Sequence, residues 1–119
     1  GYELIVATSK PEPFAKEILE HFDLAKYFTH ICGSNLDETR GKKEEVIKYA
    51  LELSHNKDKS TILMIGDREY DVNGAKINKI KSAGVLYGYG KKEEFEKAKA
   101  DYIFKTVKDL QDFLTKDSV

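Results

Sequence analysis

Residues 62–71 have the sequence Ile-Leu-Met-Ile-Gly-Asp-Arg-Glu-Tyr-Asp, and this stretch decides the predicted fold. Its unbroken apolar run predicts a strand buried on both faces, which is typical of parallel sheets that are covered by helices. The run ends at a glycine, and Asp67 and Asp71 follow four residues apart. Ligands bind at the carboxyl ends of strands in such sheets. Two carboxylates at this place are therefore a candidate divalent-metal site.

The segments around this stretch alternate between strand and helix patterns. We expect strands at residues 2–7, 27–32, 61–65, 82–87 and 101–104, and helices at residues 11–22, 42–54, 70–80, 91–100 and 106–114. Strands that alternate with helices form parallel βαβ units with right-handed crossovers. The predicted fold class is therefore α/β, as a three-layer α/β/α sandwich with a parallel sheet.

Length, composition and net charge limit the number of domains and the classes of binding partner that we expect. The chain has 119 residues with 40% hydrophobic and 34% charged residues, which is typical of one globular domain. A formal net charge of −1 argues against non-specific nucleic-acid binding, and no apolar run is long enough to span a membrane. The single cysteine, Cys32, has apolar neighbours and is expected to be a buried, reduced thiol. A cytoplasmic location follows from these features.

Two candidate phosphate-binding groups fall at element boundaries. Thr8 and Ser9 end the first predicted strand, where their hydroxyls either bind phosphate oxygens or cap the helix that follows. Lys43 begins the second predicted helix, where a cation faces the positive end of the helix dipole at a cost of about 0.3–1 kcal/mol. A bound anion would offset that cost. The adjacent Lys42 leaves the choice of lysine open by one residue.

The two aspartates also have a purely structural interpretation, with Asp67 as a helix N-cap and Asp71 as an acid in the first helical turn. The spacing alone does not decide between this and Mg²⁺ binding, for which carboxylate oxygens are suitable ligands. Thr8, Lys43 and Asp67 would all lie at the carboxyl edge of a parallel sheet. That shared edge favours a common site.

Three other groups are assigned structural roles. Gly88-Tyr89-Gly90 is too short for a dinucleotide-binding fingerprint and predicts a turn. The mixed charges at residues 91–94 predict a solvated helix face. The three histidines, His21, His30 and His55, share no metal-ligand spacing, so we expect them at surface or core positions.

Several motifs in order along the chain resemble the haloacid dehalogenase superfamily, and most closely its phosphoglycolate phosphatase-like branch. The similarity covers nearly the whole chain. It rests on residues 6–11, 33–47, 66–76, 84–90 and 100–103. Several motifs in the same order are far more specific than any one of them.

The resemblance implies a Rossmann-like core and a Mg²⁺-dependent phosphatase that hydrolyses a small phosphorylated metabolite. Thr8 matches the family's second motif, which binds the transferring phosphoryl group, with Ser9 beside it. Lys43 matches the third motif, whose cation offsets charge on the nucleophile and the phosphoryl oxygens. Asp67 matches the Mg²⁺ ligand of the fourth motif, and Asp71 supports that ion directly or through water.

The chain departs from the family pattern in one respect. The family's nucleophile is the first aspartate of an Asp-x-Asp motif, and no such motif occurs in these 119 residues. By resemblance, that strand would lie between the strands ending at Thr8 and at Asp67, with a cap domain between it and residue 1. We therefore expect this chain to be the C-terminal part of a core domain, inactive alone, with the missing N-terminal part as its partner.

Two other functions remain open at this point. A response-regulator receiver also combines aspartates, a hydroxyl residue and a lysine around Mg²⁺. In that family the acidic residues precede the hydroxyl and the lysine, whereas here Thr8 and Lys43 precede Asp67. A non-catalytic module that binds phosphate and Mg²⁺ is the second alternative, because the chain has no nucleophile motif.

Overall fold

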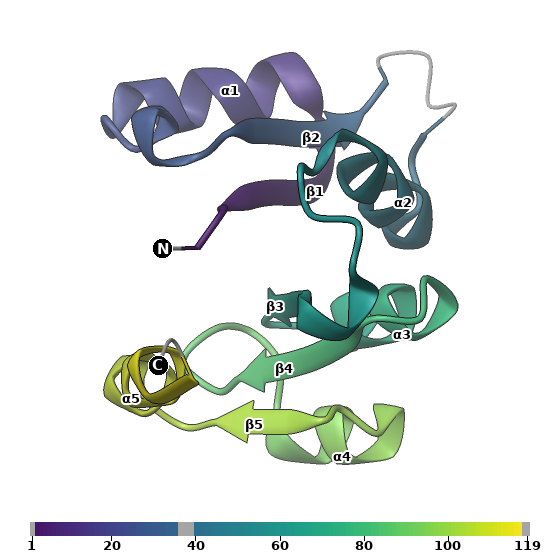
Figure 1. The fold of residues 1–119 in the computed structure, drawn as a ribbon, viewed down its shortest axis with the longest axis vertical. Helices are drawn as coiled ribbons and strands as arrows, with labels where there is room; N and C mark the ends of the chain where they lie inside the picture. Colours follow the sequence, from purple (N-terminus) through teal and green to yellow (C-terminus); the bar gives the residue numbers. More distant parts are fainter. Residues whose placement is uncertain (1, 36–39, 118–119) are drawn as a thin grey trace. The chain divides into compact units, whose positions relative to one another are not determined.

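The computed structural model describes residues 2–35 and 40–117, which divide into two compact units (Figure 1). The N-terminal unit comprises residues 2–57, and the C-terminal unit starts at Asp58. Every strand pairing in either unit is parallel, which confirms the predicted α/β class. None of the helices in the described ranges is long and apolar enough to cross a membrane.

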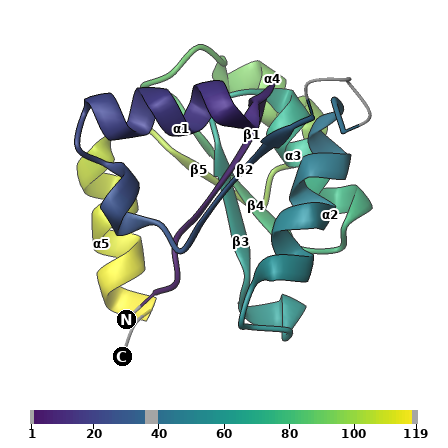
Figure 2. The same ribbon diagram turned by 90° about the horizontal axis from the view of Figure 1, so that it is seen from above.

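The N-terminal unit is a two-stranded parallel sheet with a helix on each face (Figure 2). Its elements are β1 (Ile5–Pro11), α1 (Glu12–His21), the 3₁₀ turn η1 (Ala25–Tyr27), β2 (His30–Ser34) and α2 (Lys43–Leu53). Cys32 of β2 is fully buried against Val46 and Ala50 of α2, as expected for a core thiol. Apolar contacts with α2 therefore hold one face of this sheet.

Strand boundaries in the N-terminal unit differ from those predicted. The ladder between β1 and β2 pairs Ile5 with His30 and Ala7 with Cys32, then shifts register and resumes at Pro11. The predicted strand at residues 27–32 begins instead as the turn η1. An apolar pattern in the sequence indicates which residues are buried. The ends of a strand are instead set by where its backbone pairs with the neighbouring strand, which the pattern does not show.

The C-terminal unit is a three-stranded parallel sheet in the order β3-β4-β5. Its elements are η2 (Lys59–Thr61), β3 (Leu63–Gly66), α3 (Glu69–Ile77), β4 (Lys81–Val85), α4 (Lys92–Ala98), β5 (Tyr102–Phe104) and α5 (Val107–Asp117). Thr106 and Asp109 exchange hydrogen bonds between side chain and backbone before α5. This capping box defines where the last helix begins.

The two faces of this sheet are covered unequally. On one face, a Cβ at Gly84 would overlap the buried Phe95 ring of α4. On the other face, the Phe113 ring of α5 packs on β5, 4.7 Å from the Tyr102 ring centroid. Register places Ile65 on the same face as Tyr102 but two strands away, and its side chain is 38% exposed. No residue of β3 is fully buried, so the prediction that this strand is buried on both faces is wrong.

One edge of β1 and one edge of β3 pair with no other strand in the described part of the chain. β1 pairs with β2 alone, and β3 pairs with β4 alone. The strands therefore form two sheets, which agrees with the expectation that a strand is missing between the strand that carries Thr8 and the strand that precedes Asp67. Each of these edges presents unpaired backbone N–H and C=O groups.

Candidate functional site

Thr8 and Lys43 come together within the N-terminal unit. Lys43 is the first residue of α2, and its Nζ donates a hydrogen bond to the Ala7 carbonyl oxygen at 3.2 Å. Ala7 ends the continuous pairing with β2, and Thr8 follows it. Ser9 is exposed in the same unpaired stretch. A cation, a hydroxyl and backbone outside the β1–β2 ladder therefore lie on β1 at the point where its continuous pairing with β2 ends.

The structure also separates the alternatives for these residues. Lys42 is the exposed N-cap of α2, and its N–H donates to Glu45 Oε1 at 3.1 Å, so Lys43 is the lysine that reaches β1. The Thr8 hydroxyl accepts from the Lys10 N–H at 3.2 Å. Helix α1 begins after Pro11 without a side-chain cap. The interpretation of Thr8 as a helix cap is therefore wrong.

A polar clamp that the sequence did not indicate holds the end of β2. Arg40 Nε donates to the Gly33 carbonyl oxygen at 2.8 Å, and Arg40 Nη2 lies 3.3 Å from Glu12 Oε1. The same Glu12 oxygen accepts from the Gly33 N–H at 3.2 Å. The Arg40 guanidinium also lies 3.8 Å from the Tyr49 ring centroid. Glu12 is more than 20 residues from both Gly33 and Arg40, so no local sequence pattern predicts these contacts. Residues 36–39, which belong to the motif at residues 33–47, lie outside the described part of the chain.

Asp67 lies just after β3 and outside helix α3, whose N-cap is Arg68. Its carboxylate Oδ2 accepts from the Tyr89 N–H at 3.3 Å, and its carbonyl oxygen accepts from the Gly90 N–H at 2.7 Å. A Cβ at Gly88 would overlap the Asp67 side chain. The predicted turn at these glycines is confirmed, and it packs against Asp67. The interpretation of Asp67 as an N-cap is wrong.

Asp71 is buried at the third position of α3. Its Oδ2 accepts from the Arg68 N–H at 3.3 Å, so it does serve the first helical turn as predicted. A Cβ at Gly66, the last residue of β3, would overlap the Asp71 carboxylate. The glycine thus lets this carboxylate approach the strand end. Asp67 and Asp71 are both brought to the carboxyl end of β3.

Glu94 of α4 holds the loop that follows Asp67. It accepts from Arg68 Nε at 3.0 Å and from the Glu69 N–H. The hydrogen bond from the Glu69 N–H and that from Arg68 lower the pKa of Glu94, so its carboxylate stays ionised. The prediction of a solvated face at residues 91–94 is wrong for Glu94. Its partners lie 25 and 26 residues away, which leaves no local pattern to find.

The donor chemistry of the aspartate pair fits Mg²⁺, which prefers oxygen ligands and commonly takes one or two carboxylates while keeping several waters. Among the described residues, a group of three convergent His, Cys, Asp or Glu ligands occurs elsewhere, at Glu3, His30 and His55. Asp67 and Asp71 therefore do not provide a complete set of protein ligands for a metal ion. They suit an ion whose other ligands are water and substrate oxygens.

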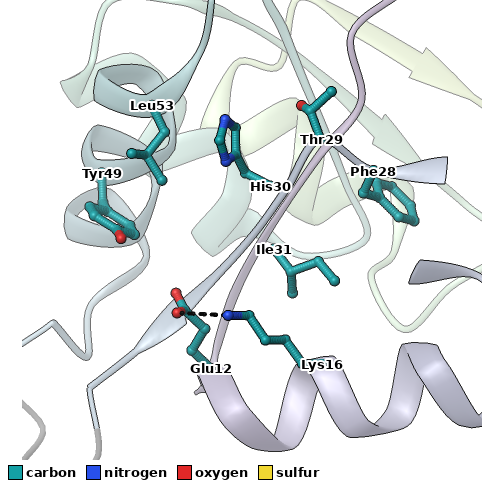
Figure 3. Close-up of a pocket in the computed structure, with 8 residues that line it drawn as sticks. All are labelled: Glu12, Lys16, Phe28, Thr29, His30, Ile31, Tyr49 and Leu53. Atoms are coloured by element: carbon teal, nitrogen blue, oxygen red, sulfur yellow. Dashed lines mark ion pairs between the residues drawn. The ribbon is translucent and has the colours of Figure 1, made fainter. Parts of the chain in front are cut away.

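A pocket of about 290 Å³ lies apart from these residues, along β2 between α1 and α2 (Figure 3). Its lining comprises Glu12, Lys16, Phe28, Thr29, His30, Ile31, Tyr49 and Leu53. None of the predicted site residues lines it. We therefore assign the candidate site to the strand ends and not to this pocket.

Comparison with known proteins gives several strong similarities. The chain is 47% identical over 94 residues to a 5'-nucleotidase from Pseudomonas aeruginosa, covering 79% of this chain and 42% of that protein. It is 40% identical over 106 residues to the tyrosine-protein kinase PtkA of Mycobacterium tuberculosis (89% and 33%). It is 33% identical over 113 residues to a phosphoglycolate phosphatase from Salmonella typhi (92% and 43%).

A solved structure confirms the fold. A predicted phosphatase from Clostridium acetobutylicum superposes with a TM-score of 0.93 at 49% identity, covering 98% of this chain and 53% of that one. The chain spans less than half the length of the three curated relatives, the 5'-nucleotidase, PtkA and the phosphoglycolate phosphatase. The model of the haloacid dehalogenase-like hydrolase family matches residues 1–85, which include Thr8, Lys43, Asp67 and Asp71. The chain therefore belongs to the haloacid dehalogenase-like hydrolase family.

Proposed function

We propose that this chain is part of a Mg²⁺-dependent phosphomonoester hydrolase that acts through an aspartyl-phosphate, with the nucleophile supplied by residues outside these 119. The observation that carries this proposal is the Lys43 ammonium, which hydrogen-bonds the carbonyl oxygen of Ala7, the residue before Thr8. A cation and a hydroxyl at a strand end suit a phosphoryl group, because phosphoryl transfer depends on positioning and on charge neutralisation.

Each residue has a role that follows from its chemistry. The Thr8 hydroxyl and nearby backbone N–H groups would orient the phosphoryl oxygens, and the Lys43 ammonium would offset their negative charge. Asp67 and Asp71 would hold Mg²⁺, which supplies further charge neutralisation when bound. The attacking carboxylate would form a bond to phosphorus as the bond to the leaving alcohol breaks. Water would then cleave the aspartyl-phosphate and release phosphate.

The unpaired edges of β1 and β3 support a nucleophile strand from outside the chain. A strand that paired with either edge would satisfy backbone groups that the strand ladders of this chain leave open.

Turnover of para-nitrophenyl phosphate with Mg²⁺ tests the proposal. We expect no turnover by the 119-residue chain, and we expect turnover by a longer protein that carries an Asp-x-Asp strand ahead of residue 1. Asp→Asn at the first position of that motif is the matched control and should abolish activity. Turnover by the 119-residue chain alone would show that the nucleophile lies within it, against the proposal.

The similarity to the tyrosine kinase PtkA favours a second candidate, phosphoryl transfer to an acceptor other than water. The same groups would serve it, because only the acceptor differs. Incubation of the longer protein with a labelled phosphate donor distinguishes the two. Release of free phosphate indicates hydrolysis, whereas label on protein tyrosine indicates transfer.

A further inference from the structure

The opposite end of β1 from Thr8 carries a second cluster of ligand-type side chains. Glu3 precedes β1, His30 is the first residue of β2, and His55 follows the end of α2. One ligand atom from each of the three lies within 4.8 Å of the other two. No metal-ligand spacing in the sequence predicts this cluster, because the residues belong to three different segments. All three belong to the N-terminal unit.

Glu3 is held as an anion with its oxygens directed into the cluster. Its Oε1 accepts from the Ser54 hydroxyl at 2.7 Å and from the His55 N–H at 3.2 Å, and its Oε2 accepts from the Thr29 hydroxyl at 3.0 Å. The Ser54 hydrogen bond is the main cause that lowers the pKa of Glu3. Carboxylates that bind metals are commonly supported by such hydrogen bonds from surrounding residues.

The two imidazoles adjoin this carboxylate and are accessible. Their rings are stacked, with an interplanar angle of 29° and centroids 6.3 Å apart. His55 Nε2 lies 3.9 Å from Glu3 Oε2, and the His55 side chain is 85% exposed. His30 lines the pocket on β2, between Thr29 and the α2 residue Leu53 (Figure 3). Both rings are therefore accessible to an ion from solvent.

We propose that Glu3, His30 and His55 bind a divalent transition-metal ion of the Zn²⁺ type. Two imidazole nitrogens and one carboxylate oxygen are a ligand set that Zn²⁺ accepts, with water in the remaining position. Zn–N bonds of about 2.0–2.1 Å in a tetrahedral site separate ligand atoms by about 3.3 Å. The cluster must therefore contract, and the exposed His55 ring can turn to do so.

This site differs in chemistry from the aspartate pair. Imidazole nitrogens favour Zn²⁺ and similar ions, whereas oxygen ligands suit Mg²⁺. A bound ion would tie the amino ends of β1 and β2 to the end of α2. It would therefore stabilise the folded N-terminal unit, by an amount that grows with the logarithm of the ion concentration above the dissociation constant.

Calorimetric titration of ZnCl₂ into the 119-residue chain at pH 7.5 tests the proposal. We expect one site that persists in 10 mM Mg²⁺, because imidazole nitrogens are poor ligands for that ion. His55→Ala and His30→Ala should each raise the dissociation constant at least about 10-fold. His21→Ala removes the third histidine, on α1, and is the matched control that should leave binding unchanged. Asp67→Asn should also leave it unchanged.

Three outcomes would overturn the proposal. Absence of binding at millimolar Zn²⁺ would show that the three groups form only an ion pair and its hydrogen bonds. Equal weakening by His21→Ala would indicate an adventitious ion only. Loss of binding in Asp67→Asn, with His55→Ala unaffected, would place the ion at the aspartates. Circular dichroism checks that each variant is folded. Because the His55 side chain is exposed, His55→Ala should disturb the fold less than His30→Ala does.

Discussion

The strand ends of the two units present their functional groups in different ways. In the N-terminal unit, Lys43 reaches β1 through a long side chain, and its Nζ donates a 3.2 Å hydrogen bond to the Ala7 carbonyl oxygen. In the C-terminal unit, the short side chains of Asp67 and Asp71 are positioned by backbone. Gly66, Gly88 and Gly90 leave room there that any Cβ would fill.

The difference matches what each group must do. A metal ligand needs a fixed oxygen position, because coordination distances tolerate little variation. A lysine that neutralises a phosphoryl group acts as a flexible point charge, and it adjusts to its substrate. Close backbone packing therefore surrounds the carboxylates, whereas the lysine reaches β1 through the end of a flexible side chain.

Substitution of one residue from each unit gives the largest expected effect. In a longer protein with the nucleophile strand, Asp67→Asn should lower kcat/KM for para-nitrophenyl phosphate by about 10³-fold or more, because the metal ligand is lost. Lys43→Ala should lower kcat by about 10²–10³-fold at saturating Mg²⁺. Initial rates over a Mg²⁺ series separate the two, because only Asp67→Asn should change the Mg²⁺ dependence.

Lys42→Ala is the matched control for the lysine, since Lys42 is exposed and its backbone, not its side chain, contacts Glu45. Its kcat should stay within about 2-fold of the parent value. An equal decrease of kcat in Lys42→Ala and Lys43→Ala would contradict a specific role of Lys43 in the site.

The thiol of Cys32 reports on the N-terminal unit alone, because the chain has no other cysteine. Burial raises the pKa of Cys32 to about 11 from an ordinary value of 9.0. At pH 8 the thiolate fraction, and with it the rate of alkylation by iodoacetamide, should be about 100-fold lower in the folded chain than in urea. Mass spectrometry of timed samples measures both rates.

The same shift sets a pH dependence of stability. A pKa that is higher in the folded state favours folding fully below the unfolded value and loses that contribution as pH rises through the folded value. The free energy of unfolding should therefore fall between about pH 9 and 11 through Cys32. Alkylation at pH 8 that is equally fast with and without urea would show that the thiol is not buried.

Glycine substitutions give the smallest expected effect and test each unit separately. A Cβ at Gly33 would meet the backbone of Lys10 and Glu12, and one at Gly84 would meet the Phe95 ring. Overpacking of this kind should lower the free energy of unfolding by about 1–3 kcal/mol in either variant, as measured by urea denaturation. Gly33→Ala should accelerate Cys32 alkylation more than Gly84→Ala does. Equal acceleration would mean that the units open together.

Much of the site was accessible from the sequence because its groups occupy element boundaries. Hydrophobic periodicity gave the order of strands and helices, and parallel strands bring their carboxyl ends to one edge. Thr8 and Lys43 were predicted at such boundaries, and Asp67 and Asp71 follow one strand four residues apart, so all four could be named as candidates from the sequence. The contacts of Glu94 and of the Glu12–Arg40 pair did not, since no local pattern records partners more than 20 residues apart.

Periodicity and ordered motifs were enough to predict the α/β class and the family, and they named Thr8, Lys43, Asp67 and Asp71 as candidate site residues. Only the folded structure shows that Lys43 and not Lys42 reaches β1, that Asp67 lies outside helix α3, and that Glu3, His30 and His55 meet. The physical reason is that side-chain direction and long-range contact are set by packing between elements, which a local pattern of residues does not encode.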